Sequence, residues 1–463
     1  MLTYTFSKGG GVSLYEQLYR HIKEDILSGR LTAGEKLPSK RTLADHLEVS
    51  VITVKNAYEQ LVAEGYIYGV EKKGYFVSSI DRPLRSGEVR PVPEAEEERS
   101  YLLDLVTNSI SAEYFPFTVW SKLMRRTILE QDTGLLRPTP FHGAVELRRA
   151  ICDNLQQFRG MTVDPEQIVI GAGTEFLYHL LIQLLGRERS YAVEDPGYGK
   201  IGRIYESNRV TLHRIAMDDA GLSAEALRES GADVVHISPS HHYPTGIVMP
   251  IARRQELLRW AAEQEGRYIL EDDYDSEFRF VGRPIPTMFS TDLHERVIYL
   301  NTFSKTIAPS IRISYMILPP HLMSEYRRRL SFYSCTVSSF EQHTLAAFMA
   351  QGRYEQHINR MRNRYRQKRD AVIDAIRNGA LSGRAEIMEQ DAGLHFLMRL
   401  DTTMSDEALR LAAAGKGVRL ALLSDYYYDS TCAPQHVVVV NYSGIELDAL
   451  RSGLERLAEL WEE

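Results

Sequence analysis

The chain has 463 residues, of which 44% are hydrophobic and 25% are charged, so it is long enough for two or three globular domains with sizeable cores. No run of eighteen apolar residues occurs and residues 1–11 lack the apolar block of a signal peptide, which argues against a membrane segment and predicts a cytoplasmic protein. The formal net charge is −7, and residues 1–80 carry ten Lys and Arg against nine Asp and Glu. Bulk charge therefore gives no argument for nucleic-acid binding.

Residues 1–80 show the pattern of a winged helix-turn-helix domain. Apolar residues recur at four-residue steps from Leu14 to Ile26, which predicts an amphipathic helix. Two short helices then begin at the N-caps Ser39 and Ser50 and are separated by a tight turn. Two aromatic runs that flank residues 69–74 predict a hairpin, or wing, with two lysines at its tip. Such a unit places its third helix in the major groove of DNA.

This segment resembles the winged-helix domain of GntR-type bacterial regulators, through Leu37-Pro38-Ser39-x-Arg41-x-Leu43-Ala44, Val49-Ser50-x-x-Thr53-Val54-Lys55 and Gly74-x-Phe76-Val77. The resemblance implies contacts to double-stranded DNA from Arg41, Ser50, Thr53, Lys55, Lys72 and Lys73. The position after Ser50, often arginine in that family, is Val51, and Ile52 follows it. This departure shifts the expected base readout toward thymine methyl groups or DNA shape. The alternative is a small helical domain used for protein contacts.

Residues 81–100 are rich in proline and charge and have no apolar period, so they are predicted to form a solvated linker. Its length would allow the DNA-reading domain to reach over a neighbouring subunit.

Residues 101–463 are predicted to form a second, α/β domain. Short apolar runs alternate with helical stretches, which predicts a doubly wound parallel sheet covered by helices on both faces. The runs are residues 168–170, 191–193, 234–237, 268–270 and 297–300. From about residue 321 a smaller α+β lobe is expected. In such sheets ligands bind beyond the carboxyl ends of the strands.

The stretch 301–312 follows the last of these runs and places Lys305 among hydroxyl groups. A lysine that is partly desolvated loses its proton more easily, and only the neutral amine forms a Schiff base. Thr302, Ser304 and Arg312 would hold a phosphate beside it. An aldehyde and a phosphate on one molecule indicate pyridoxal 5'-phosphate. Taken alone, the stretch fits a surface lysine in a Ser/Thr-rich loop equally well.

Other strand ends carry groups that suit the same cofactor. Gly173 and Thr174 open a helix whose N–H groups would bind phosphate, although an ordinary strand-to-helix turn has the same pattern. Tyr198 would stack on a planar ring, Asp272 would pair with a pyridine nitrogen and Tyr274 would reach a phenolic oxygen. The acidic cluster alone would suggest Mg²⁺, but the lysine stretch on the next strand favours the pyridine interpretation. No metal site is predicted.

Together these motifs resemble, from about residue 101 to the end, the fold-type I pyridoxal phosphate enzymes of the aminotransferase superfamily. The resemblance implies cofactor contacts from Gly173, Thr174, Tyr198, Asp272, Tyr274, Thr302, Ser304, Lys305 and Arg312. Where many aminotransferases have the asparagine of Asn-Pro-x-Gly, this chain has Tyr243, and His242 is a candidate replacement. An arginine that binds the effector carboxylate is expected in the small lobe. Arg419 is the candidate there, with Lys200 and Arg203 as others.

The whole chain resembles the MocR-type (GabR-like) subfamily of GntR regulators, in which a winged helix is joined to an aminotransferase-like domain. The resemblance implies a pyridoxal phosphate-dependent transcription regulator that senses an amino compound or the cofactor through an external aldimine at Lys305. It also implies a homodimer with each winged helix packed on the partner's large domain. An aminotransferase with an accessory DNA-binding domain stays open, because every cofactor residue is present. A third alternative keeps the fold for dimerisation only.

Overall fold

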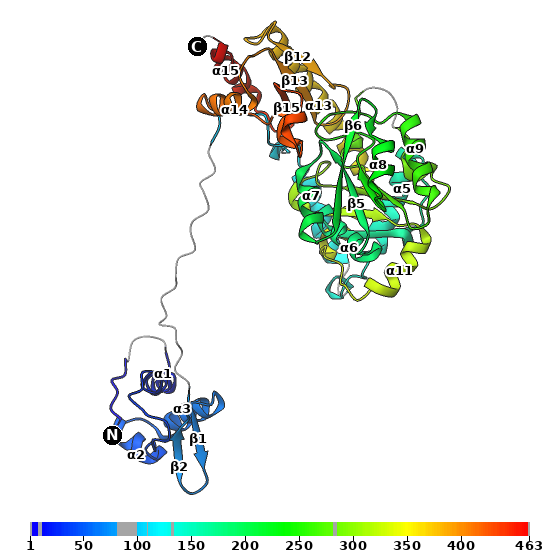
Figure 1. Ribbon diagram of the computed structural model, residues 1–463. Coiled ribbons are helices and arrows are strands. Elements are labelled where there is room, and N and C mark those ends of the chain that lie inside the picture. Colours follow the sequence, from blue (N-terminus) through cyan, green and yellow to red (C-terminus); the bar gives the residue numbers. More distant parts are fainter. Residues whose placement is uncertain are drawn as a thin grey trace. The chain divides into compact units, whose positions relative to one another are not determined.

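The computed structural model describes residues 2–7, 12–80, 100–108, 110–130, 134–280 and 285–461 (Figure 1). Its contacts divide the chain into two compact units, Met1–Glu97 and Glu98–Glu463. Residues 81–99, nearly all of the predicted linker, lie outside the described residues. Among the residues that are described, no helix is both long and apolar enough to cross a membrane.

The first unit is a three-helix domain with a β-hairpin. Its elements are α1 (Leu14–Leu27), α2 (Lys40–Leu47), α3 (Val51–Ala63), β1 (Ile67–Val70) and β2 (Gly74–Val77). The two strands pair antiparallel, with Ile67 opposite Val77. This is the predicted winged helix-turn-helix architecture.

Local signals determine where the helices of this unit begin. Ser39 Oγ accepts a hydrogen bond from the Thr42 amide at 3.2 Å, and Ser50 Oγ accepts one from the Thr53 amide at 3.1 Å. Each hydroxyl satisfies one of the amide groups that a helix start leaves without an internal partner. Between α2 and α3, Glu48 adopts a left-handed conformation with φ 52°, which makes the tight turn. The helices pack around fully buried residues, including Leu18, Leu43, Val54 and Leu61.

The second unit is built on an eight-stranded sheet with the order β4-β11-β10-β9-β8-β5-β6-β7. The strands are β4 (Ile168–Ala172), β5 (Ser190–Asp195), β6 (Thr211–Asp218), β7 (Gly221–Leu222), β8 (Val234–Ile237), β9 (Tyr268–Asp272), β10 (Val297–Thr302) and β11 (Ile313–Ile317). β10, β9, β8, β5 and β6 are parallel, whereas β11 runs antiparallel to both β10 and β4. β4 therefore runs in the same direction as β10, and the carboxyl ends of these strands lie along one edge.

Helices cover both faces of this sheet, as alternation along β10 shows. Ile298 and Leu300 pack in a cluster with α6 (Thr174–Leu185) and α11 (Pro320–Leu330), whereas Tyr299 packs in a cluster with α5 (Val145–Arg159) and α12 (Ser339–Ala350). Successive side chains of a strand point to opposite faces, so one strand contributes to both layers. The remaining helices are α4 (Phe117–Glu130), α7 (Gly199–Ser207), α8 (Ala224–Ser230), α9 (Ile251–Glu263) and α10 (Met288–Thr291). The doubly wound α/β prediction is confirmed.

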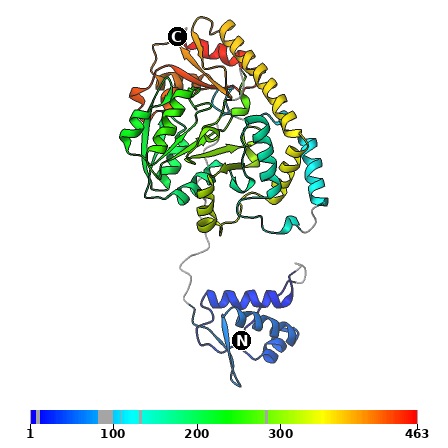
Figure 2. The same cartoon turned by 90° about the vertical axis from the view of Figure 1, so that its right-hand side faces the viewer.

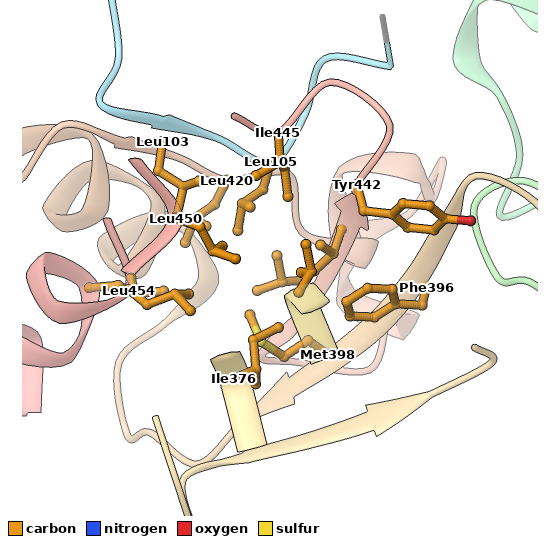
Figure 3. Close-up of a cluster of buried hydrophobic side chains, with 14 of the residues drawn as sticks. Leu103, Leu105, Ile376, Phe396, Met398, Leu420, Tyr442, Ile445, Leu450 and Leu454 are labelled. Atoms are coloured by element: carbon orange, nitrogen blue, oxygen red, sulfur yellow. The ribbon is translucent and has the colours of Figure 1, made fainter. Parts of the chain in front are cut away.

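A smaller lobe lies against one end of the large sheet domain in both views (Figures 1 and 2). Its antiparallel sheet has the order β12-β13-β15. Its elements are α13 (Arg353–Asn378), β12 (Ala385–Met388), β13 (His395–Leu400), α14 (Asp406–Gly415), β14 (Val418–Arg419), β15 (Val437–Asn441) and α15 (Leu447–Ala458). Leu103 and Leu105, from β3 (Leu103–Asp104) and the residue after it, join its core beside Phe396 and Leu450 (Figure 3). The lobe is therefore made from both ends of the second unit.

Candidate cofactor site at the strand ends

The topology of the sheet brings the predicted cofactor residues to one edge. Gly173 follows β4, Thr302 ends β10 and Asp272 ends β9. β11 is antiparallel to β4, and its Ile313 lies opposite Ala172. Arg312, which directly precedes β11, therefore lies at this same edge. Residues that are far apart in the chain are thus neighbours through strand pairing alone.

Gly173 and Arg312 form one side of an anion-binding cradle. Gly173 has φ 91° and directly precedes α6, so the first amide groups of that helix are available to an anion. A Cβ atom at this position would lie 2.1 Å from Nη2 of Arg312, which only a glycine avoids. Thr302 Oγ1 lies 3.0 Å from Ser304 Oγ at the neighbouring strand end. These donors have the chemistry that a phosphate group requires.

Glu175 already engages two cations at this cradle. Its carboxylate accepts hydrogen bonds from Arg312 and from Lys200, one on each oxygen. Lys200, predicted as an effector contact, therefore lies beside Arg312, which is predicted to hold the phosphate. One carboxylate shared by two cations leaves a net positive charge for a bound anion.

Asp272 provides a buried carboxylate with one oxygen free. Its Oδ2 accepts a hydrogen bond from the Tyr178 hydroxyl and lies 3.4 Å from Nε2 of His236. Its Oδ1 is buried and has no hydrogen-bond partner among the described residues. A buried acceptor without a partner is costly, so this atom fits a group that brings a proton, such as a protonated ring nitrogen. The residues present therefore fit the predicted cofactor.

Tyr274 is held by a residue that the sequence motifs do not single out. Nδ1 of His241 lies 3.3 Å from the Tyr274 hydroxyl and 2.9 Å from Oδ2 of Asp275. His241 and Asp275 are both buried. In the sequence, His241 is only one polar residue of a turn. The sequence signal that could have identified His241 was its position in the turn after a predicted strand.

Lys305 lies in the turn after β10 and is partly buried. Burial lowers the pKa of its ammonium group, and the Asp275 carboxylate opposes that change. A lysine with a lowered pKa holds more of the neutral amine that attacks an aldehyde. The structure thus places an amine with a lowered pKa in the turn after the strand that lies next to β9, which Asp272 ends.

Tyr198 and Tyr243 occupy the outer side of the site. Tyr198 is 49% exposed and meets Tyr243 edge-to-face, with ring centroids 5.9 Å apart. An exposed face of Tyr198 is available for stacking on a planar ring. The Tyr243 hydroxyl lies 2.7 Å from that of Tyr426 in the small lobe. Tyr243 therefore contacts the small lobe.

His242 lies in the interior as an uncharged partner of Glu194. Its Nδ1 is 2.7 Å from Thr245 Oγ1, and its Nε2 is 3.4 Å from Glu194 Oε2. Burial raises the pKa of Glu194 to about 8 and lowers the pKa of His242 to about 3. Both groups are therefore neutral near pH 7, and His242 is not exposed to an effector.

The two remaining effector candidates have surface positions. Arg419 lies on β14 and contacts Asp104 and Thr107, and none of these contacts belongs to the strand-end cluster. Arg203 is exposed on α7. In the part of the chain that the structure describes, no group of three or more His, Cys, Asp and Glu is arranged to hold a metal ion.

The predicted DNA contacts lie on the recognition elements of the first unit. Arg41 is exposed on α2, and Lys55 is exposed on α3. Ser50 and Thr53 bond to each other through their hydroxyls at 2.8 Å, in addition to the helix cap. Ile52 is 68% exposed at the start of α3. Two exposed lysines, Lys72 and Lys73, lie at the turn of the hairpin.

Comparison with known proteins matches both units to characterised families. Residues 14–77 match the bacterial regulatory proteins of the gntR family, and residues 102–441 match aminotransferase class I and II. Solved structures share the second fold. They include a kynurenine aminotransferase from Pyrococcus horikoshii (TM-score 0.68, 24% identity, 79% of this chain and 92% of that chain) and an archaeal alanine:glyoxylate aminotransferase (TM-score 0.69, 21% identity, 79% and 92%).

Relatives align over almost the whole chain. The uncharacterized HTH-type transcriptional regulator YdeL of Bacillus subtilis is 38% identical over 97% of both chains. The probable rhizopine catabolism regulatory protein MocR of Rhizobium meliloti is 31% identical over 96% of this chain and 93% of that protein. PdxR of Corynebacterium glutamicum, a pyridoxine biosynthesis transcriptional regulator, is 30% identical over 96% of both. Fold and relatives together define a helix-turn-helix transcription regulator with an aminotransferase-like domain. The chain belongs to the MocR-type regulators of the GntR family.

Proposed function

We propose that this regulator binds pyridoxal 5'-phosphate at Lys305 and senses an amino compound, or the cofactor itself, through that lysine. The free, buried Oδ1 of Asp272 carries the proposal, because it needs a proton donor that the cofactor's ring nitrogen would supply. The Gly173 and Arg312 cradle supports phosphate binding at the same edge. The solved LysN from Thermus thermophilus, which shares the fold, is complexed with a phosphopyridoxyl-leucine.

When bound, the cofactor supplies an aldehyde that a primary amine can capture. In this chain Lys305 would supply one such amine, and an effector amine would compete with it for the aldehyde. Lys200, which donates to Glu175 in the structure, would meet an acidic group on the effector in place of that carboxylate. A ligand shifts the lobes only if it binds two arrangements unequally, so release of Lys305 must change the contacts of the small lobe.

In the DNA-binding half of the proposal, the winged helix binds double-stranded operator DNA. Arg41 and Lys55 would meet the DNA from α2 and α3, and the wing lysines would meet phosphates. Val51 and Ile52 present exposed apolar side chains at the start of α3, which suits contact with thymine methyl groups. The protein would act in the cytoplasm.

A homodimer is part of the proposal, with each winged helix packed on the partner's large domain. Apolar side chains are exposed on and after α4, namely Phe117, Ile128, Leu129 and Leu136. Clusters of exposed apolar residues mark protein contacts. Leu129→Asp is expected to weaken the dimer, which sedimentation at several concentrations would measure.

Absorbance of the cofactor-loaded protein tests the central proposal. Lys305→Ala should abolish the absorbance band of lysine-bound cofactor, whereas Lys122→Ala, an exposed lysine on α4, should leave it unchanged. A band that persists in Lys305→Ala would reject the assignment. Titration with a panel of amines and amino acids would identify the effector. Sustained keto-acid production from one of them would instead support an enzyme.

A further inference from the structure

His241 joins the large sheet domain to the small lobe. It follows β8, and its ring lies 4.6 Å from the ring of His395 on β13. On the small lobe, Gly393 has φ 69°, and a Cβ atom there would lie 1.8 Å from Cε1 of His241. The imidazole thus occupies the space that a side chain at position 393 would need. Any shift of residues 393–395 must move this ring or open a void beside it.

The same ring reaches the groups around Lys305. Nδ1 of His241 lies 2.9 Å from Oδ2 of Asp275, which is hydrogen-bonding distance. Asp275 in turn acts electrostatically on Lys305. Nε2 of His241 is buried without a partner among the described residues. Its position is therefore set by Asp275 on one side and by packing against the small lobe on the other.

We propose that His241 is a positioning residue that couples the position of the small lobe to the ionisation of Lys305. While the lobe holds the ring in place, the imidazole shares the Asp275 carboxylate. When the ring is displaced, Asp275 is released to the Lys305 ammonium. The charged and ionisable groups that face His241 are Asp275, Tyr274, His395, the adjacent His242, and Arg159 and Arg279 of a small cavity that it lines.

The coupling would act in both directions, because linkage is reciprocal. Release of Lys305 by an effector changes the charge beside Asp275, and the His241 ring transmits that change to Gly393 and His395. The use of this coupling in sensing rests on the proposed function. The coupling itself concerns only side chains of this chain and can be measured without cofactor or DNA.

Carbamylation by cyanate provides that measurement on the full-length, cofactor-free protein. Cyanate is small and reacts with the neutral amine, and peptide mass spectrometry follows Lys305 alone. The pH midpoint of the rate reports the ionisation of Lys305, whereas the plateau rate reports its accessibility. A separate absorbance titration with pyridoxal phosphate tests the proposed function, so the two can fail independently.

Gly393→Ala tests the contact from the small lobe. It should raise the pH midpoint of Lys305 by about half a unit or more, because the displaced ring frees Asp275 to stabilise the ammonium. Gly383→Ala is the matched control, since Gly383 lies in the same lobe with φ 75° and has nothing within 4 Å of an added Cβ. An unchanged or lower midpoint in Gly393→Ala, or an equal rise in Gly383→Ala, would overturn the proposal.

Substitutions of His241 test the ring directly. His241→Leu keeps the bulk of the side chain but removes the imidazole nitrogen that contacts Asp275. The pH midpoint of Lys305 carbamylation should therefore rise in this variant, as in Gly393→Ala. His241→Asn restores a donor near the place of Nδ1 and should return the midpoint toward wild type. A double variant that combines His241→Leu with Gly393→Ala should shift no further than either single variant. Additive shifts, or a His241→Leu midpoint at the wild-type value, would contradict the coupling.

The Asp275 carboxylate is tested separately. Asp275→Asn should lower the pH midpoint of Lys305 carbamylation, and a rise in that midpoint would contradict the electrostatic step.

Discussion

The Tyr178 hydroxyl donates a hydrogen bond to Oδ2 of Asp272 inside the large sheet domain. This bond orients the carboxylate and leaves Oδ1 as a buried acceptor with no partner in the described part of the chain. An oxygen that is already oriented in this way would reduce the reorganisation that binding of a proton donor requires.

Replacing the Asp272 carboxylate should weaken cofactor binding. Asp272→Asn keeps the shape but loses the charge that would pair with a protonated ring nitrogen. A hydrogen bond to a charged group contributes about 1.5–3 kcal/mol, so the Kd for pyridoxal phosphate should rise by roughly 10- to 100-fold. Equilibrium dialysis would measure it, with the exposed Asp219→Asn as control. Equal affinity in Asp272→Asn and wild type would contradict the assignment.

Gly173→Ala should damage the phosphate cradle specifically. The added Cβ would meet Nη2 of Arg312 at 2.1 Å and displace it. Gly160→Ala is the control, because Gly160 also has a positive φ of 66° but has open space around an added Cβ. Gly160→Ala should lose about 1–2 kcal/mol of stability from its left-handed backbone. Gly173→Ala should lose more, because its φ of 91° and ψ of 158° lie in a region that is essentially reserved for glycine. Only Gly173→Ala should weaken pyridoxal phosphate binding, by about tenfold or more. Equal Kd values for the two variants would place the phosphate elsewhere.

Glu194 should make the protein less stable as the pH rises toward 8. Its pKa is raised to about 8 by burial, so the folded state keeps a proton that the unfolded chain, with a pKa of about 4.3, has lost. The free energy of unfolding should therefore fall as pH rises, by up to about 1.4 kcal/mol per unit, until pH passes the folded pKa.

Glu194→Gln removes this titration and should make the profile shallower between about pH 7 and pH 8. Glu271 and Glu277, whose pKa values burial raises to about 7, contribute mainly below this window. Urea unfolding at several pH values would measure the slope, with the exposed Glu229→Gln as control. A Glu194→Gln profile as steep as that of wild type would show that another group is responsible.

The wing lysines should contribute affinity without sequence preference. Lys72→Ala together with Lys73→Ala should weaken binding to all DNA sequences alike. The double variant should also reduce the steepness of the slope of log K against log salt concentration by about two. Fluorescence anisotropy at several salt concentrations would measure both effects. Lys122→Ala, in the other unit, should change neither. A loss confined to one operator sequence would instead assign these lysines to base readout.

Much of this protein could be predicted from short stretches of sequence. The caps at Ser39 and Ser50 and the apolar runs that became β4, β5, β8, β9 and β10 depend on residues close in the chain. Alternation of these runs with helices was enough to predict a parallel sheet and a site at its carboxyl edge. The candidate pair Lys305 and Arg312 could be recognised because both belong to one stretch.

The partners of these side chains depend on packing between elements that are distant in the chain. Glu175 binds both Arg312 and Lys200, Tyr243 contacts Tyr426, and Arg419 contacts Asp104. These partners are far apart in sequence, and the direction of each side chain depends on the packing of several elements at once. Short stretches of the chain therefore fix the elements, their order and the residue types along one edge of the sheet. The fold places His241 against both lobes, because strand pairing and lobe packing bring Asp275 and Gly393 to its ring.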